Sequence, residues 1–207
     1  MDVKQEYLRI SLTDKCNYRC KYCLPNGNIN SIENNKFLKI EEYFQLAKIL
    51  NNLIGLKKIR LTGGEPLLRK GLTSLIQMLS TLNPKPEISI TTNGHYLFEK
   101  INDLIISGID NINISIESLD SNKFKQTTGN GNLKKVLQSL KKAKKLGFKN
   151  IKINTVITKT NFNEIPEFIH FAKKHEVSLR FIELMSFSSS SGYHKMNSFQ
   201  QKILKKN

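Results

Sequence analysis

Residues 16–23 read Cys-Asn-Tyr-Arg-Cys-Lys-Tyr-Cys and follow directly after an expected strand over residues 7–12. They contain the three cysteines of the chain, Cys16, Cys20 and Cys23. We interpret these as thiolate ligands of a 4Fe-4S cluster, because CxxxCxxC is a tight spacing with Tyr22 set inside it. A cubane cluster normally takes four cysteines, so a trio leaves one iron free to bind a small molecule. The segment is therefore expected to be a reaction site.

Zinc binding and disulfide formation are the alternatives for this trio. Zinc would need a fourth ligand at finger-like spacing, but the four histidines lie far downstream, from His95 onward. Disulfides pair cysteines, so one of three would be left over, and the N-terminus has no apolar secretion segment. We expect a reducing compartment: the cytoplasm, or the plastid stroma if the gene is organelle-encoded, as the AT-rich composition allows.

Length and charge limit the other classes of protein. A chain of 207 residues fits one α/β domain, and no apolar run approaches the roughly 20 residues that cross a bilayer. The net charge of +16 comes from lysines spread along the chain, with one concentration in an expected helix over residues 133–146. Such a helix usually presents a solvated face. Without a nucleic-acid module signature, we expect no nucleic acid and no membrane as partner.

Short β-rich runs alternate with amphipathic helical runs, for example over residues 40–53 and 163–174. The expected strands span residues 7–12, 58–62, 88–92, 111–117, 151–157 and 178–182. Strict alternation predicts an α/β fold with a parallel sheet covered by helices. Six units fall short of the eight that close a barrel, so the prediction is a partial (β/α)6 TIM-like barrel.

One face of every expected strand is polar, since side chains alternate with period two. Arg9, Arg60, Lys152 and Arg180 fall on that face in four different strands. Together they suit a polyanion such as a nucleoside triphosphate, because guanidinium groups bind phosphate oxygens in pairs. An antiparallel sheet with one face in water would show the same alternation, but the intervening helices disfavour it.

Two motifs follow expected strands, where α/β folds place ligands. They are Thr62-Gly63-Gly64-Glu65-Pro66 and Thr91-Thr92-Asn93-Gly94. Paired glycines let backbone groups approach a ligand closely, and an adjacent carboxylate can steady a ligand ammonium group. Each motif alone could be a plain turn. After a CxxxCxxC loop, however, the Gly-Gly-Glu-Pro run is highly specific.

These motifs resemble those of the radical S-adenosylmethionine (SAM) superfamily, which has CxxxCxxC after the first strand and a GGEP-like loop after the second. The match extends to the GTP 3′,8-cyclase family of molybdenum-cofactor biosynthesis. It is carried by residues 8–20, 58–67, 113–115 and 180–185, which include Leu8-Arg9-Ile10-Ser11-Leu12-Thr13-Asp14-Lys15 and Arg180-Phe181-Ile182-Glu183-Leu184-Met185. The resemblance runs essentially the whole length of the chain.

The resemblance implies a role for each matching residue. The cysteine trio would hold one SAM-binding 4Fe-4S cluster. The SAM site would include Tyr22, Gly63, Gly64, Glu65, Ser115 and Met185. GTP would contact Arg9, Arg60, Thr91 and Lys152, with Arg180 nearby in a role that stays open. No side chain is expected to act as a catalytic acid or base.

The activity implied is that of a lyase, which forms (8S)-3′,8-cyclo-7,8-dihydroguanosine 5′-triphosphate from GTP through a 5′-deoxyadenosyl radical. A one-electron donor would be a partner. Family members continue further and carry a second cysteine trio, which this chain lacks. We therefore expect residues 1–207 to be a single core domain, truncated relative to the family, with residues 185–207 starting the C-terminal extension. The expected partner is a second copy of the chain in a homodimer, or another chain that supplies the missing region.

Two other functions stay open. One is a radical SAM enzyme with another substrate, such as a peptide-modifying maturase. The other is a non-catalytic metal-binding remnant.

Overall fold

The computed structural model describes residues 6–23, 37–185 and 191–198. The backbone divides into two compact units. Unit 1 comprises residues 1–16, 30–114 and 135–151, and unit 2 comprises residues 17–29, 115–134 and 152–207. The cysteine loop, residues 13–23, therefore contributes to both units.

Unit 1 is built on parallel strands in chain order. They are β1 (Tyr7–Ser11), β2 (Lys58–Thr62), β3 (Glu87–Thr92) and β4 (Asn111–Ser115), the last residue of which belongs to unit 2. In register, Arg9 pairs with Arg60, Arg60 with Ser89, and Thr91 with Asn113. The polar side chains of these strands therefore share one face of the sheet.

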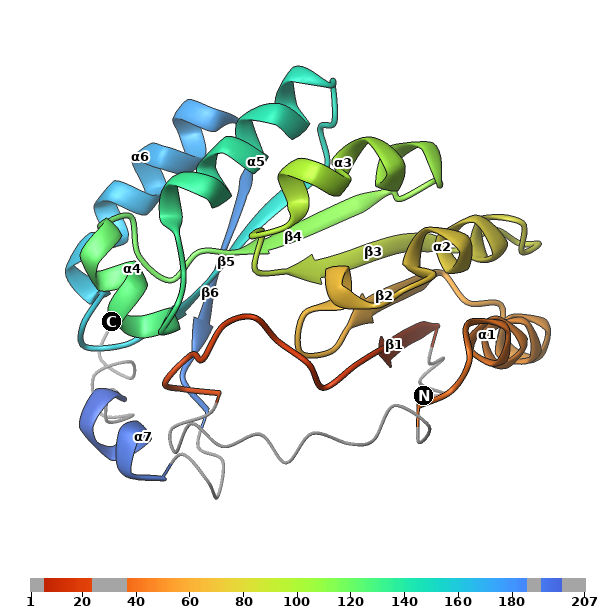
Figure 1. The fold of residues 1–207 in the computed structure, drawn as a ribbon, viewed down its shortest axis with the longest axis horizontal. Coiled ribbons are helices and arrows are strands. Elements are labelled where there is room, and N and C mark those ends of the chain that lie inside the picture. Colours follow the sequence, from red (N-terminus) through yellow and green to blue (C-terminus); the bar gives the residue numbers. More distant parts are fainter. Residues whose placement is uncertain (1–5, 24–36, 186–190, 199–207) are drawn as a thin grey trace, which may run out of the picture. The chain divides into compact units, whose positions relative to one another are not determined.

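Helices cover the opposite, apolar face of these strands. They are α1 (Ile40–Ile54), α2 (Leu72–Ser80), α3 (Leu97–Ile106) and α5 (Leu133–Lys145), with a short 3-10 helix, η2 (Pro66–Leu68), after β2. Figure 1 shows α1, α2 and α3 along the strands of this unit. Ile59, Leu61, Ile88, Ile90 and Ile112 are fully buried, as expected for side chains between a sheet and its helices.

Unit 2 contains the parallel pair β5 (Ile151–Ile157) and β6 (Ser178–Glu183). Its helices are α4 (Ser121–Thr128), η3 (Phe162–Glu164), α6 (Ile165–His175) and α7 (Ser191–Asn197). Figure 1 shows α6 alongside this strand pair. Helix α4 begins where the Asp120 side chain accepts a 2.8 Å hydrogen bond from the Lys123 backbone amide, the geometry of an N-cap aspartate.

All six expected strands are present, with ends within two residues of the prediction. The helix expected to start at residue 163 begins as η3 and becomes α-helical only at Ile165, before Pro166, because proline favours the first turn of a helix. The apolar face of β6 is less buried than expected, since Phe181 is 37% exposed. Of the expected C-terminal extension, residues 186–190 and 199–207 lie outside the described residues.

Within the described part of the chain, no helix is both long enough and apolar enough to cross a membrane.

Candidate active site

In unit 1, the pairing of β1 with β2 continues beyond the strands into the loops that follow them. The Leu12 amide donates to the Thr62 carbonyl at 2.9 Å, the Gly64 amide to Thr13 at 2.6 Å, and the Glu65 amide to Lys15 at 2.7 Å. These bonds join the start of the cysteine loop to residues 63–66, the GGEP loop. The backbone immediately before Cys16 is thereby fixed.

The paired glycines allow this close approach. A Cβ atom on Gly63 would lie 2.4 Å from the Thr13 carbonyl oxygen, and one on Gly64 would lie 2.4 Å from that of Lys15. Gly63 also has φ of +143°, a conformation that side chains disfavour. The close neighbour of both glycines in unit 1 is thus the backbone of the cysteine loop.

Glu65 connects the GGEP loop to the end of β3. Its side chain is fully buried. The carboxylate accepts hydrogen bonds from the Thr92 hydroxyl at 2.7 Å, the Asn93 amide at 2.8 Å and the Leu67 amide at 3.0 Å. Burial raises the pKa of this carboxyl group, whereas the three hydrogen bonds oppose that rise. Glu65 therefore braces the loops that follow β2 and β3.

Asn93 links this brace to a predicted cluster ligand. Its backbone amide binds Glu65, and its side-chain Nδ2 lies 3.8 Å from the Cys16 sulfur, in hydrogen-bonding geometry. Its Oδ1 accepts from the His95 amide at 3.0 Å, which fixes the orientation of the side chain. The Cys16 sulfur therefore faces a polar donor.

Three of the residues predicted to bind GTP lie on one face of the unit 1 sheet. Arg9 and Arg60 occupy paired positions on β1 and β2, and Thr91 lies on the same face of β3. Arg9 is exposed, whereas Arg60 is only 8% exposed. The Arg60 guanidinium lies 5.5 Å from the Tyr7 ring centroid, a cation–π contact. This face thus carries two paired guanidinium groups.

In unit 2, the second half of the cysteine loop packs on helix α4. The Arg19 amide donates to the Thr128 carbonyl at 2.9 Å, and the Lys21 amide donates to Thr127 at 3.0 Å. The buried Tyr18 ring meets Phe124 edge to face at 6.2 Å. Backbone pairing and aromatic packing together hold residues 18–21 against the end of α4.

The thiols of Cys20 and Cys23 influence each other in unit 2, which raises the pKa of Cys20 and lowers the pKa of Cys23. Cys23 is exposed, and Cys20 is partly exposed. Two predicted ligands therefore present neighbouring sulfur atoms.

Tyr22, between these two cysteines, is held by a buried carboxyl group. Its hydroxyl donates a 2.7 Å hydrogen bond to Glu117 Oε1, and Glu117 Oε2 accepts from the Val156 amide of β5 at 2.9 Å. Glu117 is 3% exposed, and burial raises its pKa to about 7, although both hydrogen bonds oppose the rise. The Tyr22 pKa is also raised, chiefly by burial.

The other predicted residues of unit 2 lie on β4, β5, β6 and the segment after β6. Lys152 and Arg180 share one face of the β5–β6 pair, where Asn154 pairs in register with Arg180. Ser115 is the last residue of β4. Met185 follows β6 and is 65% exposed.

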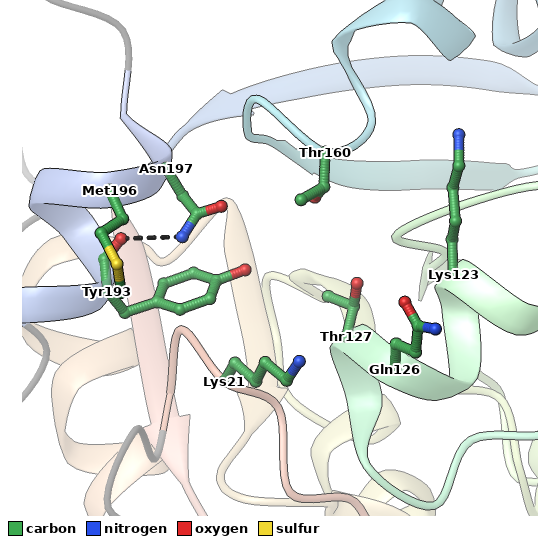
Figure 2. A pocket seen from close by; sticks show the side chains of 8 residues that line it. All are labelled: Lys21, Lys123, Gln126, Thr127, Thr160, Tyr193, Met196 and Asn197. Carbon is green, nitrogen blue, oxygen red and sulfur yellow. Dashed lines mark hydrogen bonds between the residues drawn. The ribbon is translucent and has the colours of Figure 1, made fainter.

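A cavity of about 320 Å³ lies beside the cysteine loop in unit 2. Its lining consists of Lys21, Lys123, Gln126, Thr127, Thr160, Tyr193, Met196 and Asn197. Figure 2 shows the Tyr193 ring of α7 and the Lys21 side chain of the cysteine loop both directed toward Thr127 of α4. The Tyr193 carbonyl accepts a 3.1 Å hydrogen bond from the Asn197 side chain.

Two residues that hold the predicted site were not singled out from the sequence. Asn93 stands in a motif that the sequence does mark, so its position was detectable but its contact with Cys16 was not. Glu117 meets Tyr22 across 95 residues of chain, and no local pattern marks that partner. Asn93 contacts the predicted ligand Cys16, and Glu117 contacts Tyr22, which lies between Cys20 and Cys23.

The donor atoms fit an iron–sulfur cluster in kind, since each predicted ligand is a free cysteine with some exposure. Among the described residues, no group of three or more His, Cys, Asp or Glu side chains is gathered so as to hold a metal ion.

Comparison with known proteins gives consistent matches. Residues 10–172 match the model of the radical SAM superfamily. A GTP 3′,8-cyclase of Clostridium botulinum (strain Hall) is 42% identical over 193 residues, covering 93% of this chain and 60% of that protein. A GTP 3′,8-cyclase of Peptoclostridium acidaminophilum is 41% identical, covering 97% of this chain and 62% of its own length. The chain thus spans about 60% of these curated relatives.

Among solved structures, Streptococcus suis SuiB bound to S-adenosylmethionine is similar with a TM-score of 0.78 and 19% identity, covering 94% of this chain and 44% of that chain. At this identity the likeness concerns the fold. It confirms the α/β class and the partial TIM-like barrel that the sequence predicts.

Proposed function

Because the chain belongs to the radical SAM superfamily, we propose that it takes part in molybdenum-cofactor biosynthesis as a GTP 3′,8-cyclase, a lyase. The identity of about 42% with curated cyclases supports the substrate assignment. We further propose that the chain acts together with a partner, either a second copy of itself or another chain.

The cysteine trio would hold one 4Fe-4S cluster, with Asn93 donating to the Cys16 sulfur and Glu117 positioning Tyr22 between the other two ligands. SAM would lie against the GGEP loop, Tyr22, Ser115 and Met185. When bound, the reduced cluster and SAM supply a 5′-deoxyadenosyl radical. The chain must orient the substrate toward that radical and exclude water.

GTP would bind through Arg9, Arg60, Thr91 and Lys152. The two paired guanidinium groups of β1 and β2 suit adjacent phosphate oxygens. In the reaction, the 5′-deoxyadenosyl radical would take the hydrogen atom of the ribose C3′–H bond and leave as 5′-deoxyadenosine, and the C3′ radical would add to C8. The proposed one-electron donor would then supply one electron, and solvent one proton, to give the dihydroguanosine product. These residues would hold C3′ near C8 and would transfer no proton themselves.

The observation that carries this proposal is the connection from Cys16 through Asn93 to Glu65. It joins the CxxxCxxC and Gly-Gly-Glu-Pro motifs by side-chain contacts within unit 1. A side-chain donor at the Cys16 sulfur favours a site that holds a cluster over a non-catalytic remnant.

The test is anaerobic reconstitution with iron and sulfide, reduction with dithionite in the presence of SAM, and measurement of 5′-deoxyadenosine with and without GTP. We expect cleavage of SAM that rises with GTP. Cleavage that ignores GTP would point to another substrate, such as a peptide. Neither cluster nor cleavage would leave a non-catalytic metal-binding remnant.

A lysine pair tests the GTP residues. Lys152→Ala should raise the GTP concentration needed to stimulate SAM cleavage about tenfold, the loss expected for one charged hydrogen bond. Cleavage of SAM without GTP should persist. Lys149→Ala removes an exposed lysine three residues earlier. It should change neither the stimulation by GTP nor the cleavage without GTP. Equal effects of both variants would exclude a specific phosphate contact by Lys152.

A further inference from the structure

The second half of the cysteine loop and the segment around helix α4 form a basic surface of unit 2. Residues 17–23 and 121–134 contain five cationic side chains and no aspartate or glutamate. The five are Arg19, Lys21, Lys123, Lys125 and Lys134, and all are exposed. Lys123 forms an ion pair with the buried Glu164 at 3.1 Å. We call these five residues, with Gln126, the α4 surface.

The α4 surface is joined directly to two predicted cluster ligands. The backbone bonds from Arg19 to Thr128 and from Lys21 to Thr127 hold the loop on the last turn of α4. Cys20 lies between the two bonded residues, and Cys23 follows two positions later. A molecule seated on α4 would therefore contact the loop that carries these sulfurs.

Two recesses beside α4 suit the binding of a protein partner. The cavity of about 320 Å³ opens on one side of α4, and a second recess of about 450 Å³ is lined by Asn122, Lys125, Gln126 and Gly129. Gln126 lines both. Met196, which is 68% exposed, and Tyr193 border the first cavity, as Figure 2 shows. Methionine, tyrosine and arginine are enriched in protein interfaces and lysine is depleted, so the recesses with Tyr193 and Met196, and not the lysines, favour a protein partner.

We propose that the α4 surface is the docking site of a small acidic one-electron carrier protein with a flavin or iron–sulfur centre. This rests on the proposed function, which requires an electron from outside the chain. Charge complementarity favours an acidic carrier, since the surface has five cations, of which Lys123 is paired with Glu164, on a chain of net charge +16. Opposite charges steer such encounters and fix their orientation.

The electron balance defines what the carrier does. The reduced carrier loses one electron, and that electron breaks the C5′–S bond of SAM. The sulfur takes the bonding pair and leaves as the neutral thioether of methionine. The electron that the carrier added remains on the 5′ carbon as the unpaired electron. The carrier ends oxidised by one electron, and no proton moves in this step.

The test compares two double charge reversals in the full chain. Lys125→Glu with Lys134→Glu alters the α4 surface at two exposed side chains. The control, Lys173→Glu with Lys174→Glu, changes the net charge equally in the exposed last turn of α6 in the same unit. Binding of a purified flavodoxin is measured by calorimetry at low and high salt. 5′-Deoxyadenosine is measured with reduced flavodoxin and, separately, with dithionite.

We expect the α4 variant to weaken flavodoxin binding about tenfold at low salt and to flatten its salt dependence, with the control within about twofold of the unmodified chain. Flavodoxin-driven cleavage should fall in parallel, and dithionite-driven cleavage should not. Equal weakening by both variants, or by neither, would overturn the docking site. If dithionite gives no cleavage in the unmodified chain, the proposed function fails, while the binding comparison still decides the docking site.

Discussion

The hydroxyl of Tyr22 and the carboxyl of Glu117 form a 2.7 Å hydrogen bond that fixes the side chain between two predicted cluster ligands. Glu117 lies just after β4 and also accepts from the Val156 amide of β5. One buried carboxyl group thus connects the cysteine loop to a strand of unit 2.

Removing the Tyr22 hydroxyl should destabilise the metal-free chain. Tyr22→Phe would leave Glu117 Oε1 buried without its donor, at a cost of about 1–3 kcal/mol in the free energy of unfolding. Urea unfolding under reducing conditions measures this. Tyr96→Phe is the control, since it keeps the ring that contacts His95 and Lys135, and it should change stability by less than about 0.5 kcal/mol. Equal losses would contradict the prediction.

Glu117 should make stability depend on pH in a particular direction. Its pKa of about 7 lies above its ordinary value of 4.5, so the folded chain holds the proton more tightly than the unfolded chain. The contribution of Glu117 to stability is therefore full below pH 4.5 and is lost as pH rises to about 7. Relative to Glu117→Gln, the unmodified chain should lose up to about 3 kcal/mol between pH 5 and pH 8.

Urea unfolding of both proteins at the two pH values measures this difference. Subtracting the curves removes the titration of groups common to both, including Glu65. Parallel pH profiles for the two proteins would show that Glu117 ionises at its ordinary pKa.

Gly64→Ala should disrupt the contact between the two motif loops. The added Cβ would meet the backbone oxygens of Lys15 at 2.4 Å and Asp14 at 2.5 Å, which cannot rotate away. We expect a loss of about 3 kcal/mol or more and reduced iron incorporation on reconstitution. Gly192→Ala is the control, because no described residue lies within 4 Å of the added atom. It should retain both the stability and the iron incorporation of the unmodified chain. Normal iron uptake by Gly64→Ala would refute a tight loop contact.

Asn93→Ala should lower the reduction potential of the reconstituted cluster. A donor near the Cys16 sulfur stabilises negative charge, which grows on reduction. Loss of about 1 kcal/mol corresponds to about 40 mV for one electron, in the negative direction. An EPR-monitored redox titration measures it, with Asn52→Ala on the exposed face of α1 as control. An unchanged or raised potential would mean that Asn93 does not act on the sulfur.

Sequence patterns sufficed for the elements of this fold because local signals mark them. The alternation of Arg60 and Thr62 with Ile59 and Leu61 places β2 to the residue, and Asp120 marks the start of α4. The helix starting at residue 163 was less well predicted, since a proline after the start shifts regular α-helix to Ile165.

The site was predictable as a set of motifs but not as a set of contacts. Spacing marks Gly63 and Gly64 as a close backbone approach, yet only the fold shows that Thr13 and Lys15 are the neighbours. The roles of Asn93 and Glu117 depend on partners 77 and 95 residues away in the chain. Such long-range pairs leave no periodicity for a single sequence to display.

The three hydrogen bonds of Glu65 have a consequence for mutational tolerance. The carboxylate caps η2 through Leu67 while it accepts from Thr92 and Asn93, so one side chain completes two loops at once. Aspartate, shorter by one methylene, would be too short to keep all three donors, and glutamine would present a donor where an acceptor is required. In a library of all substitutions, position 65 should accept glutamate alone, whereas nearby exposed Lys70 should accept most residues.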